Sequence, residues 1–281
     1  MARRKTLITG AAGGMGRACA RLFGNTSDLV LADVAAPSLE RFTEELRGDG
    51  FTVIGAHAGD LGDAALLAAL TADLAGTEGF NVVHTAGLSP ALAGARPIME
   101  VNLIATVKLL DALEPILRPS SAAVMIASSA GHLMPHIPAT LALLDAPLAA
   151  DFLDNIRAVY EKMGDGSDYS NAGISYSLSK LAVHRLAETR ALTWGPRGAR
   201  ITTISPGMIL TPMGRKEVAT PGGKAMQDAA PIGRPGVAAD IAMAAHFLCS
   251  DAASFITGCD LKVDGGSIAA FRHRAAPASG A

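Results

Sequence analysis

Short apolar runs alternate with longer segments of helical spacing along almost the whole chain. Continuous apolar runs predict strands at residues 6–8, 29–33, 52–56, 80–87, 122–127, 201–204 and 260–263. Such runs are typical of parallel strands that are covered on both faces. Helical periodicity occupies residues 17–23, 38–47, 64–74, 98–117, 176–192 and 237–248. The alternation predicts right-handed crossovers and a doubly wound parallel sheet of the α/β class, with helices on both faces.

The chain shows no internal boundary. Its 281 residues are enough for one large domain or two small ones, but no repeat, linker or charge block divides them, so we predict a single domain over residues 1–281. A helical insertion at about 132–172, with its helix expected at about 149–162, is longer than a strand-to-helix connection needs. It could be a surface decoration, an oligomer contact or a wall of a substrate pocket. The tail, about 268–281, is expected to be mobile or to lie on a partner.

Composition excludes some partners. The net charge is −2 and there is no long basic run, so nucleic acid is not an expected partner. The apolar stretch after the basic start breaks at Gly10, too early for a signal peptide or a membrane span. Cys19, Cys249 and Cys259 lack metal spacing, and we expect reduced thiols in or near the core of a cytoplasmic protein.

A glycine-rich turn follows the first predicted strand and precedes the first helix. It runs Thr9-Gly10-Ala11-Ala12-Gly13-Gly14-Met15-Gly16. Gly10 can turn tightly off the strand, and Gly14 and Gly16 allow backbone to approach a diphosphate. Free N–H groups at the helix start favour the negative charge. Strand, turn and helix together predict a Rossmann-type dinucleotide site rather than an ordinary surface turn.

Asp33 ends the second predicted strand. From there a carboxylate can accept hydrogen bonds from an adenosine ribose diol, and it would repel a 2′-phosphate. Val34 and Ala35 follow without a basic residue, and residues 11–13 are uncharged. We therefore predict NAD rather than NADP as the cofactor. The alternative is a strand-end aspartate that caps the next turn.

Four polar residues are candidates for the chemistry. Tyr176 and Lys180 stand four apart on a predicted helix and so share one face. A neighbouring ammonium stabilises a phenolate and lowers its pKa. Ser128 ends the fifth predicted strand, beside the crevice where parallel sheets bind ligands. Asn102, on an apolar helix, is either a core amide bonded to backbone or part of a relay that holds water near Lys180.

Together these residues resemble the single-domain branch of the short-chain dehydrogenase/reductase family. The matching pieces, in the family's order, are Thr9-Gly10-x-x-x-Gly14-x-Gly16, Asp33, Asp60-Leu61, Thr85-Ala86-Gly87, Asn102, Ser128, Tyr176-x-x-x-Lys180, and Pro206-Gly207 with Thr211. The resemblance extends to about Gly266. It implies a nicotinamide-dependent oxidoreductase that is a homodimer or homotetramer.

The resemblance also implies residue roles. Tyr176 would be the catalytic acid/base, Lys180 would lower its pKa and hold the nicotinamide ribose, Ser128 would polarise the substrate oxygen, and Asn102 would support a water relay. Cofactor contacts are implied for Gly10, Ala12, Gly13, Gly14, Met15, Gly16, Asp33, Asp60, Leu61, Ala86, Gly87, Tyr176, Lys180, Pro206, Gly207, Ile209 and Thr211.

Three departures from the family pattern are informative. The usual asparagine-rich turn after the fourth strand reads His84-Thr85-Ala86-Gly87. Ser128 and Ser129 both follow the fifth strand, and strand alignment favours Ser128. A short interval before Asn102 and a long one before Tyr176 resemble the bacterial 3α-hydroxysteroid dehydrogenase/carbonyl reductase subgroup.

The resulting prediction is an NAD-dependent oxidoreductase that interconverts a secondary alcohol and a ketone. The subgroup implies a bulky alicyclic, steroid-like or aromatic substrate. The alternatives are an NADP-dependent carbonyl reductase and a non-catalytic NAD(H)-binding regulatory protein. The segment 207–235 either closes over the ligands or is an exposed loop. His132, His136 and His184 are not expected to be catalytic, and no histidine cluster indicates a metal.

Overall fold

A seven-stranded sheet forms the centre of the protein, in a computed structural model that describes residues 3–274. All neighbouring strands are parallel, in the order β3-β2-β1-β4-β5-β6-β7. The predicted α/β class and all seven predicted strands are confirmed. The strands are β1 (Arg4–Thr9), β2 (Ser27–Asp33), β3 (Val53–Ala58), β4 (Phe80–His84), β5 (Ala122–Ile126), β6 (Arg200–Pro206) and β7 (Asp260–Val263).

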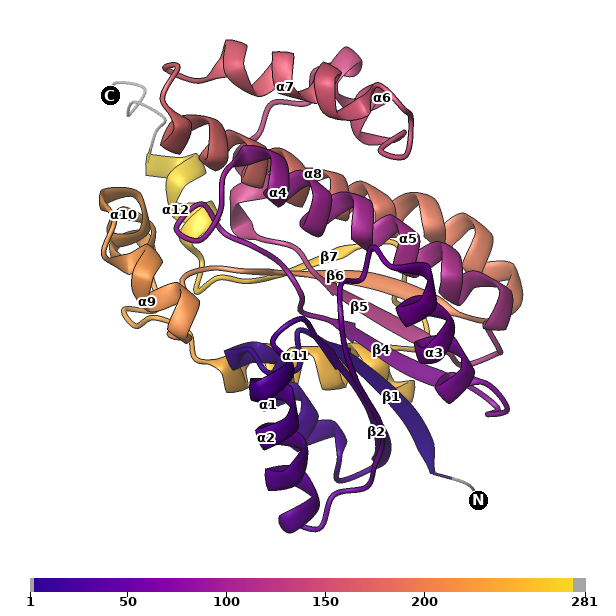
Figure 1. The fold of residues 1–281 in the computed structure, drawn as a ribbon. Helices are drawn as coiled ribbons and strands as arrows, with labels where there is room; N and C mark the ends of the chain where they lie inside the picture. The colour runs from indigo at the N-terminus through magenta and orange to yellow at the C-terminus, as the bar shows by residue number, and fades with distance from the viewer. Residues whose placement is uncertain (1–2, 275–281) are drawn as a thin grey trace.

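Helices cover both faces of the sheet (Figure 1). One face carries α1 (Gly14–Phe23), α2 (Ala36–Gly48) and α11 (Ala238–Cys249), and the other carries α3 (Ala64–Leu74), α5 (Ala105–Leu113) and α8 (Asp168–Trp194). Each face has its own apolar core, because side chains of a central strand point alternately to the two sides. On β1, Leu7 packs into one core and Ile8 into the other, and both are fully buried.

The strand order reverses between β1 and β4. Thr9, the last residue of β1, pairs with Ala32 of β2 on one side and His84 of β4 on the other. The chain leaves β1 toward α1 on one face, and leaves β4 toward helices on the opposite face. A crevice for ligands opens at such a switch point, outside the carboxyl ends of the strands.

The predicted helix at 98–117 is interrupted. It is divided into α4 (Ala95–Met99), a π turn (Glu100–Ile104), α5 and a 3-10 turn (Glu114–Ile116). Periodicity could not reveal this, because a π turn adds one residue without removing the apolar face. Such turns occur often at functional sites, and this one contains Asn102.

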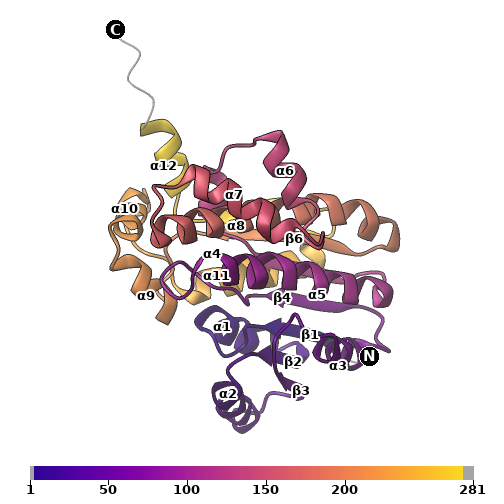
Figure 2. The same cartoon turned by 45° about the horizontal axis from the view of Figure 1, so that its top comes forward.

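The insertion is mostly helical. It contains α6 (Pro138–Leu144), which was not predicted, and α7 (Phe152–Met163), close to the helix expected at 149–162. Both helices pack on α8, and α7 also packs on α4 (Figure 2). Helix α8 begins at Asp168, eight residues before the predicted start at Tyr176, because the Ser167 hydroxyl caps it by accepting from the Ser170 N–H at 3.2 Å.

Two regions in which no helix was predicted form helices. The segment 207–235 contains α9 (Pro212–Val218) and α10 (Pro221–Ala229), and the start of the expected tail is α12 (Ser267–Arg274). Residues 275–281 of that tail lie outside the described residues. Short 3-10 turns occur at Ser129–Leu133, Gly195–Arg197 and Asp251–Ala253.

The cysteine prediction is correct for two of three residues. Cys19 and Cys249 are buried, but Cys259, which directly precedes the edge strand β7, is exposed. None of the helices within residues 3–274 combines the length and the apolar character that crossing a membrane requires.

Candidate active site

The glycine turn brings α1 unusually close to the sheet. Gly10 has φ +66°, and a Cβ there would lie 2.7 Å from the Ala86 amide nitrogen. A Cβ on Gly16 would lie 2.1 Å from the Gly10 carbonyl oxygen. Neither position therefore accepts a side chain, and both the conformation and the close approach require glycine.

The start of α1 fits a diphosphate. Its N-cap is Gly13, which offers no side-chain acceptor, and its first turn has no acidic residue, so the turn's N–H groups remain available to an anion. Gly14 lies against Thr211, which follows β6. A Cβ on Gly14 would lie 2.7 Å from the Thr211 methyl carbon. The cradle thus fits the diphosphate of a dinucleotide.

Asp33 lies beside this turn, at the end of β2. One carboxylate oxygen accepts the Ala12 N–H at 2.9 Å, and the other accepts the Ala35 N–H at 2.9 Å. Each oxygen keeps capacity for a further hydrogen bond. The aspartate therefore both caps its turn, as the alternative interpretation had it, and presents a carboxylate beside the glycine turn.

His84 and Thr85 replace the expected asparagine at the end of β4. The two ring nitrogens of His84 contact the hydroxyls of Thr9 at 2.7 Å and Thr106 at 2.8 Å. The Thr85 hydroxyl donates to the Thr9 carbonyl at 2.8 Å. These contacts tie β4 to the start of the glycine turn, so the departure from the family pattern preserves the shape of the crevice.

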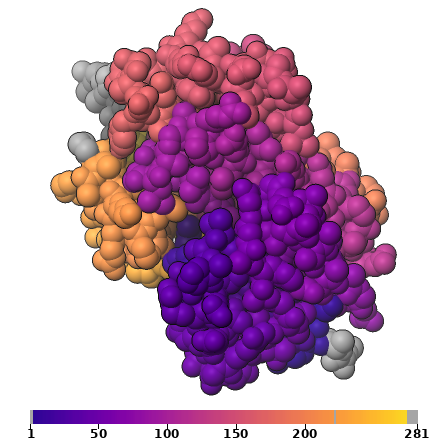
Figure 3. All heavy atoms as spheres, viewed as in Figure 1, coloured from indigo at the N-terminus to yellow at the C-terminus, as the bar shows by residue number. Residues whose placement is uncertain are grey.

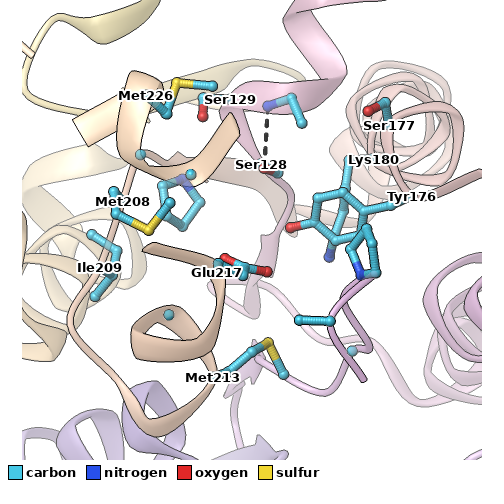
Figure 4. Close-up of a pocket in the computed structure, with 18 of the residues that line it drawn as sticks. Ser128, Ser129, Tyr176, Ser177, Lys180, Met208, Ile209, Met213, Glu217 and Met226 are labelled. Atoms are coloured by element: carbon cyan, nitrogen blue, oxygen red, sulfur yellow. Dashed lines mark hydrogen bonds between the residues drawn. The ribbon is translucent and has the colours of Figure 1, made fainter. Parts of the chain in front are cut away.

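Tyr176, Lys180 and Ser128 meet in one cavity of about 300 Å³ at the carboxyl edge of the sheet. Figure 3 shows the surface hollowed between α9–α10 and the rest of the molecule. In Figure 4 the Tyr176 hydroxyl points into this cavity beside Ser128, and Lys180 lies next to the phenol ring. The predicted cofactor residues that line the same cavity are Met15, Gly87, Tyr176, Lys180, Pro206, Gly207, Ile209 and Thr211.

The electrostatics differ from the sequence expectation. Burial raises the pKa of Tyr176, the Glu217 carboxylate raises it further, and the Ser128 hydroxyl opposes both. Lys180, expected to lower this pKa, donates instead to the Ile126 carbonyl at 2.8 Å. Burial lowers the pKa of Lys180 to about 8, against the opposing effect of Glu217. Among residues 3–274, the Ser128 hydroxyl is therefore the group that favours the phenolate.

The structure places the two candidate serines differently. Ser128 precedes the turn Ser129–Leu133, and its hydroxyl accepts the Ala130 N–H at 3.1 Å. The same hydroxyl lies beside the Tyr176 phenol, whose pKa it lowers. Ser129 also lines the cavity, on the Met226 side in Figure 4. The geometry favours Ser128 as the partner of Tyr176.

Comparison with known proteins agrees with this arrangement. A family model described as enoyl-(acyl carrier protein) reductase matches residues 162–267. The chain is 31% identical over 274 residues to the short-chain dehydrogenase/reductase bsc3 of Alternaria brassicicola, covering 95% of this chain and 96% of that protein. The chain belongs to the short-chain dehydrogenase/reductase family. It is therefore an oxidoreductase of that family.

Two further members of the family are similar over almost the whole chain. The D-threitol dehydrogenase of Mycolicibacterium smegmatis is 31% identical over 274 residues, with 92% of this chain and 91% of that protein covered. A solved structure of the 3-alpha-hydroxysteroid dehydrogenase from Pseudomonas sp. B-0831, complexed with NADH, superposes with a TM-score of 0.73. It is 26% identical and covers 97% of this chain and 100% of that chain. The expected resemblance to hydroxysteroid dehydrogenases is confirmed.

The side chain of Asn102 forms hydrogen bonds with the backbone of Leu88. Its Oδ1 accepts the Leu88 N–H at 2.7 Å, and its Nδ2 donates to the Leu88 carbonyl at 3.0 Å. The π turn places this buried amide next to the catalytic helix, where Nδ2 also contacts the Ser179 hydroxyl at 3.3 Å. A Cβ on Gly87 would lie 3.2 Å from Asn102 Oδ1 and 3.5 Å from Lys180 Nζ. Asn102 thus fixes the loop that faces Lys180.

The remaining predicted cofactor residues lie at the same edge of the sheet. The Asp60 carboxylate accepts the Gly62 N–H at 2.7 Å, whereas the Leu61 side chain packs into the core. Gly207 follows β6 so closely against β7 that a Cβ would lie 2.7 Å from Asp264 Cα. Thr211 caps α9 by accepting the Gly214 N–H at 3.1 Å. Asp60 and Leu61 follow β3, whereas Gly207 and Thr211 follow β6, so the two pairs lie on opposite sides of the switch point between β1 and β4.

A histidine pair lies beneath the site, which the sequence did not predict. His184 Nε2 contacts the Ser205 hydroxyl at 2.7 Å, and His132 Nε2 contacts Asp260 Oδ2 at 2.7 Å. The two rings are 4.4 Å apart, and their nitrogens lie within 4.8 Å of an Asp260 oxygen. The two histidines therefore cluster around Asp260, while the absence of a metal stays a prediction. The cluster connects the turn after Ser128 with α8 and with β7.

Several cavity residues could not be recognised from the sequence. Glu217 reaches the cavity from α9, and Tyr169 from the first turn of α8, at the end of the predicted insertion. Motif spacing gives no signal for them, because the packing of distant segments alone brings them to the site. Four methionines also line the cavity, namely Met15, Met208, Met213 and Met226.

Proposed function

We propose that this protein is an NAD-dependent dehydrogenase/reductase that interconverts a bulky, largely apolar secondary alcohol and its ketone. The observation that carries the proposal is the meeting of Ser128, Tyr176 and Lys180 in one cavity at the carboxyl edge of the sheet. Met15, at the end of the glycine turn, lines the same cavity.

The side chains divide the work of the proposed reaction. When bound, the nicotinamide supplies the acceptor or donor of hydride. Tyr176 takes the proton of the substrate hydroxyl at its phenol oxygen during oxidation and returns it during reduction. The Ser128 hydroxyl donates a hydrogen bond to the substrate oxygen as negative charge develops there. Burial and the Glu217 carboxylate keep the pKa of Tyr176 high, and Ser128 and a bound cationic ring would lower it.

Lys180 and Asn102 support the proton transfer from below. The Lys180 ammonium is held by the Ile126 carbonyl at 2.8 Å, on the same face of α8 as Tyr176. The side chains of Asn102 and Lys180 both lie close to Gly87, because a Cβ on Gly87 would contact the Asn102 Oδ1 and the Lys180 Nζ. We assign Lys180 to holding the nicotinamide ribose, and Asn102 to supporting a water-mediated proton relay.

The preference for NAD rests on the charges around Asp33. Its carboxylate would repel a 2′-phosphate, and Val34, which follows it, is exposed and apolar. The nearby basic side chains of α1 are already paired: Arg17 with Glu45, and Arg21 with Glu45 and Asp49. These arginines are therefore engaged with α2 rather than free to bind a phosphate.

A cofactor and alcohol screen tests the proposal. Wild type and Tyr176→Phe are mixed with NAD⁺ or NADP⁺ and a panel of alicyclic, steroidal and aryl secondary alcohols, and absorbance of the reduced nicotinamide is followed. We expect turnover with NAD⁺ that is lost in Tyr176→Phe, which retains the ring but not the proton acceptor. Faster turnover with NADP⁺ would overturn the cofactor assignment. NADH binding without any turnover would favour a regulatory protein.

The proposal includes a homodimer or homotetramer. Apolar side chains are exposed on α11 at Met243 and Phe247, and Phe255, between α11 and β7, is fully exposed. Exposed apolar groups gathered at one edge are typical of an interface between protein chains. Light scattering on the purified protein measures the oligomeric state directly.

A further inference from the structure

Glu217 gives the substrate cavity an unusual charge pattern. Of the residues that line the cavity, Lys180 and Glu217 carry the charges, and the rest are apolar, small or hydroxyl-bearing. Lys180 points to the Ile126 carbonyl at the floor of the site. Figure 4 shows the Glu217 carboxylate entering from α9, on the side opposite Tyr176. The wall that faces Tyr176 across the cavity is therefore acidic.

The surroundings of Glu217 leave its charge incompletely compensated. Burial raises its pKa, while the Lys180 ammonium and the Ser89 hydroxyl lower it. The Ser89 hydroxyl is fully buried yet makes no hydrogen bond within normal geometry. A buried polar group without a partner is costly, and a carboxylate in an apolar pocket retains acceptor capacity for a donor. Of the two groups, the Glu217 carboxylate lines the cavity and can therefore accept a hydrogen bond from a donor placed there, whereas Ser89 lies behind the cavity wall.

Building on the proposed function, we propose that Glu217 selects substrates that carry a second hydrogen-bond donor, a hydroxyl or an ammonium group, remote from the carbinol carbon. The same carboxylate excludes substrates with a carboxylate or other anion at that end, because two like charges in a partly desolvated site repel strongly. The methionine side chains accommodate the apolar body between the two polar ends, since thioethers adapt to irregular shapes.

The acidic wall distinguishes substrates that are anionic at one end from those that carry a hydrogen-bond donor there. An anionic carrier-linked thioester or an acid-bearing steroid would place negative charge against Glu217. A neutral diol or an amino alcohol would place a donor there. The acidic wall favours the second class, whatever the shape of the apolar body.

A series of cyclohexanols tests the inference, with hydrogen, hydroxyl, ammonium or carboxylate at the 4-position. In the wild type, kcat/KM should be higher for the hydroxyl and ammonium members than for cyclohexanol, and lowest for the carboxylate. In Glu217→Gln the ammonium member should lose about tenfold to a hundredfold relative to cyclohexanol, the range expected for a hydrogen bond to a charged group. The carboxylate member should gain by a similar factor.

The control variant is Asp228→Asn. Asp228 lies on α10 of the same segment, pairs with Lys224 at the surface, and does not line the cavity. Asp228→Asn removes one negative charge, as Glu217→Gln does, but removes it outside the cavity. The substrate selectivity of this variant should therefore match that of the wild type. If Glu217 only latched α9 onto the loop at Ser89, Glu217→Gln would change KM for all four members alike, and this result would overturn the inference.

Binding to the NADH-loaded protein separates this inference from the proposed function. Cyclohexylammonium and cyclohexanecarboxylate cannot be oxidised at a carbinol, and their binding is followed by NADH fluorescence. Preference for the cation that reverses in Glu217→Gln supports the inference even if no alcohol is turned over. Turnover of alcohols with no such preference overturns the inference and leaves the proposed function intact. Failure of both ions to bind, in wild type and Glu217→Gln, also overturns it.

Discussion

Replacing each of the adjacent serines by alanine tests the geometry of the catalytic group most directly. The Ser128 hydroxyl lies beside the Tyr176 phenol, whereas Ser129 lies toward Met226 (Figure 4). In the proposed mechanism, Ser128→Ala removes the hydrogen-bond donor to the substrate oxygen. Loss of one such donor lowers kcat by about 10²–10³, or about 2.7–4 kcal/mol of transition-state stabilisation.

The same change affects stability and pH dependence in defined directions. The Ala130 N–H loses its acceptor, which lies at 3.1 Å, and loss of a cap of this kind costs about 1 kcal/mol of stability. Because Ser128 lowers the pKa of Tyr176, its removal raises that pKa. Oxidation needs the deprotonated phenol, so the rising limb of the kcat/KM profile should move to higher pH.

The assay compares wild type, Ser128→Ala and Ser129→Ala with saturating NAD⁺ and an alcohol from the screen. Initial rates over a range of pH give kcat and KM, and thermal unfolding shows whether each variant is folded. We expect the loss to fall on kcat in Ser128→Ala, with much smaller changes in Ser129→Ala. Full activity of Ser128→Ala, or a larger loss in Ser129→Ala, would refute the assignment.

Three other results are expected. Burial lowers the pKa of His184 to about 4 and of His84 to about 3, from 6.5 in the unfolded chain, so stability is complete above pH 6.5 and is lost as pH falls through these values; urea unfolding across this range measures it. Gly16→Ala should abolish NADH binding, because its Cβ would lie 2.1 Å from the Gly10 oxygen, while Gly48→Ala, with no atom within 4 Å, should bind normally. Asp33→Asn should raise the kcat/KM ratio of NADP⁺ to NAD⁺ about tenfold or more, since charges about 4 Å apart repel by about 1–4 kcal/mol; an unchanged ratio would contradict the role of Asp33.

The sheet could be predicted from the sequence because its strands are apolar on both faces. Runs such as residues 29–33 have no polar face to confuse them with a helix. The π turn at Glu100–Ile104 could not be predicted, because it changes only the backbone hydrogen bonding of an apolar helix. Helices α9 and α10 were missed because glycine and proline are frequent in segment 207–235, and there the helices begin with proline after a threonine cap.

Only part of the candidate site could be predicted from the sequence. Glycine positions and the Tyr176–Lys180 spacing are local in sequence, so the glycine turn and the catalytic helix could be placed in advance. The acidic wall could not, because Glu217 reaches the cavity only through the packing of α9 against distant segments. The sign of the pKa change of Tyr176 was also beyond the sequence, since burial is a property of the folded chain.

The two walls of the cavity rest on parts of the molecule with very different local stability. Helix α8, which carries Tyr176, buries twelve residues, Trp194 among them. Helix α9 buries Gly214, and the residues of α10 whose burial is described are all at least partly exposed. Local opening costs least where few apolar contacts must break. Local opening of the α9–α10 wall should therefore cost less free energy than opening of α8, so ligand exchange through this wall would leave Tyr176 and Lys180 in place.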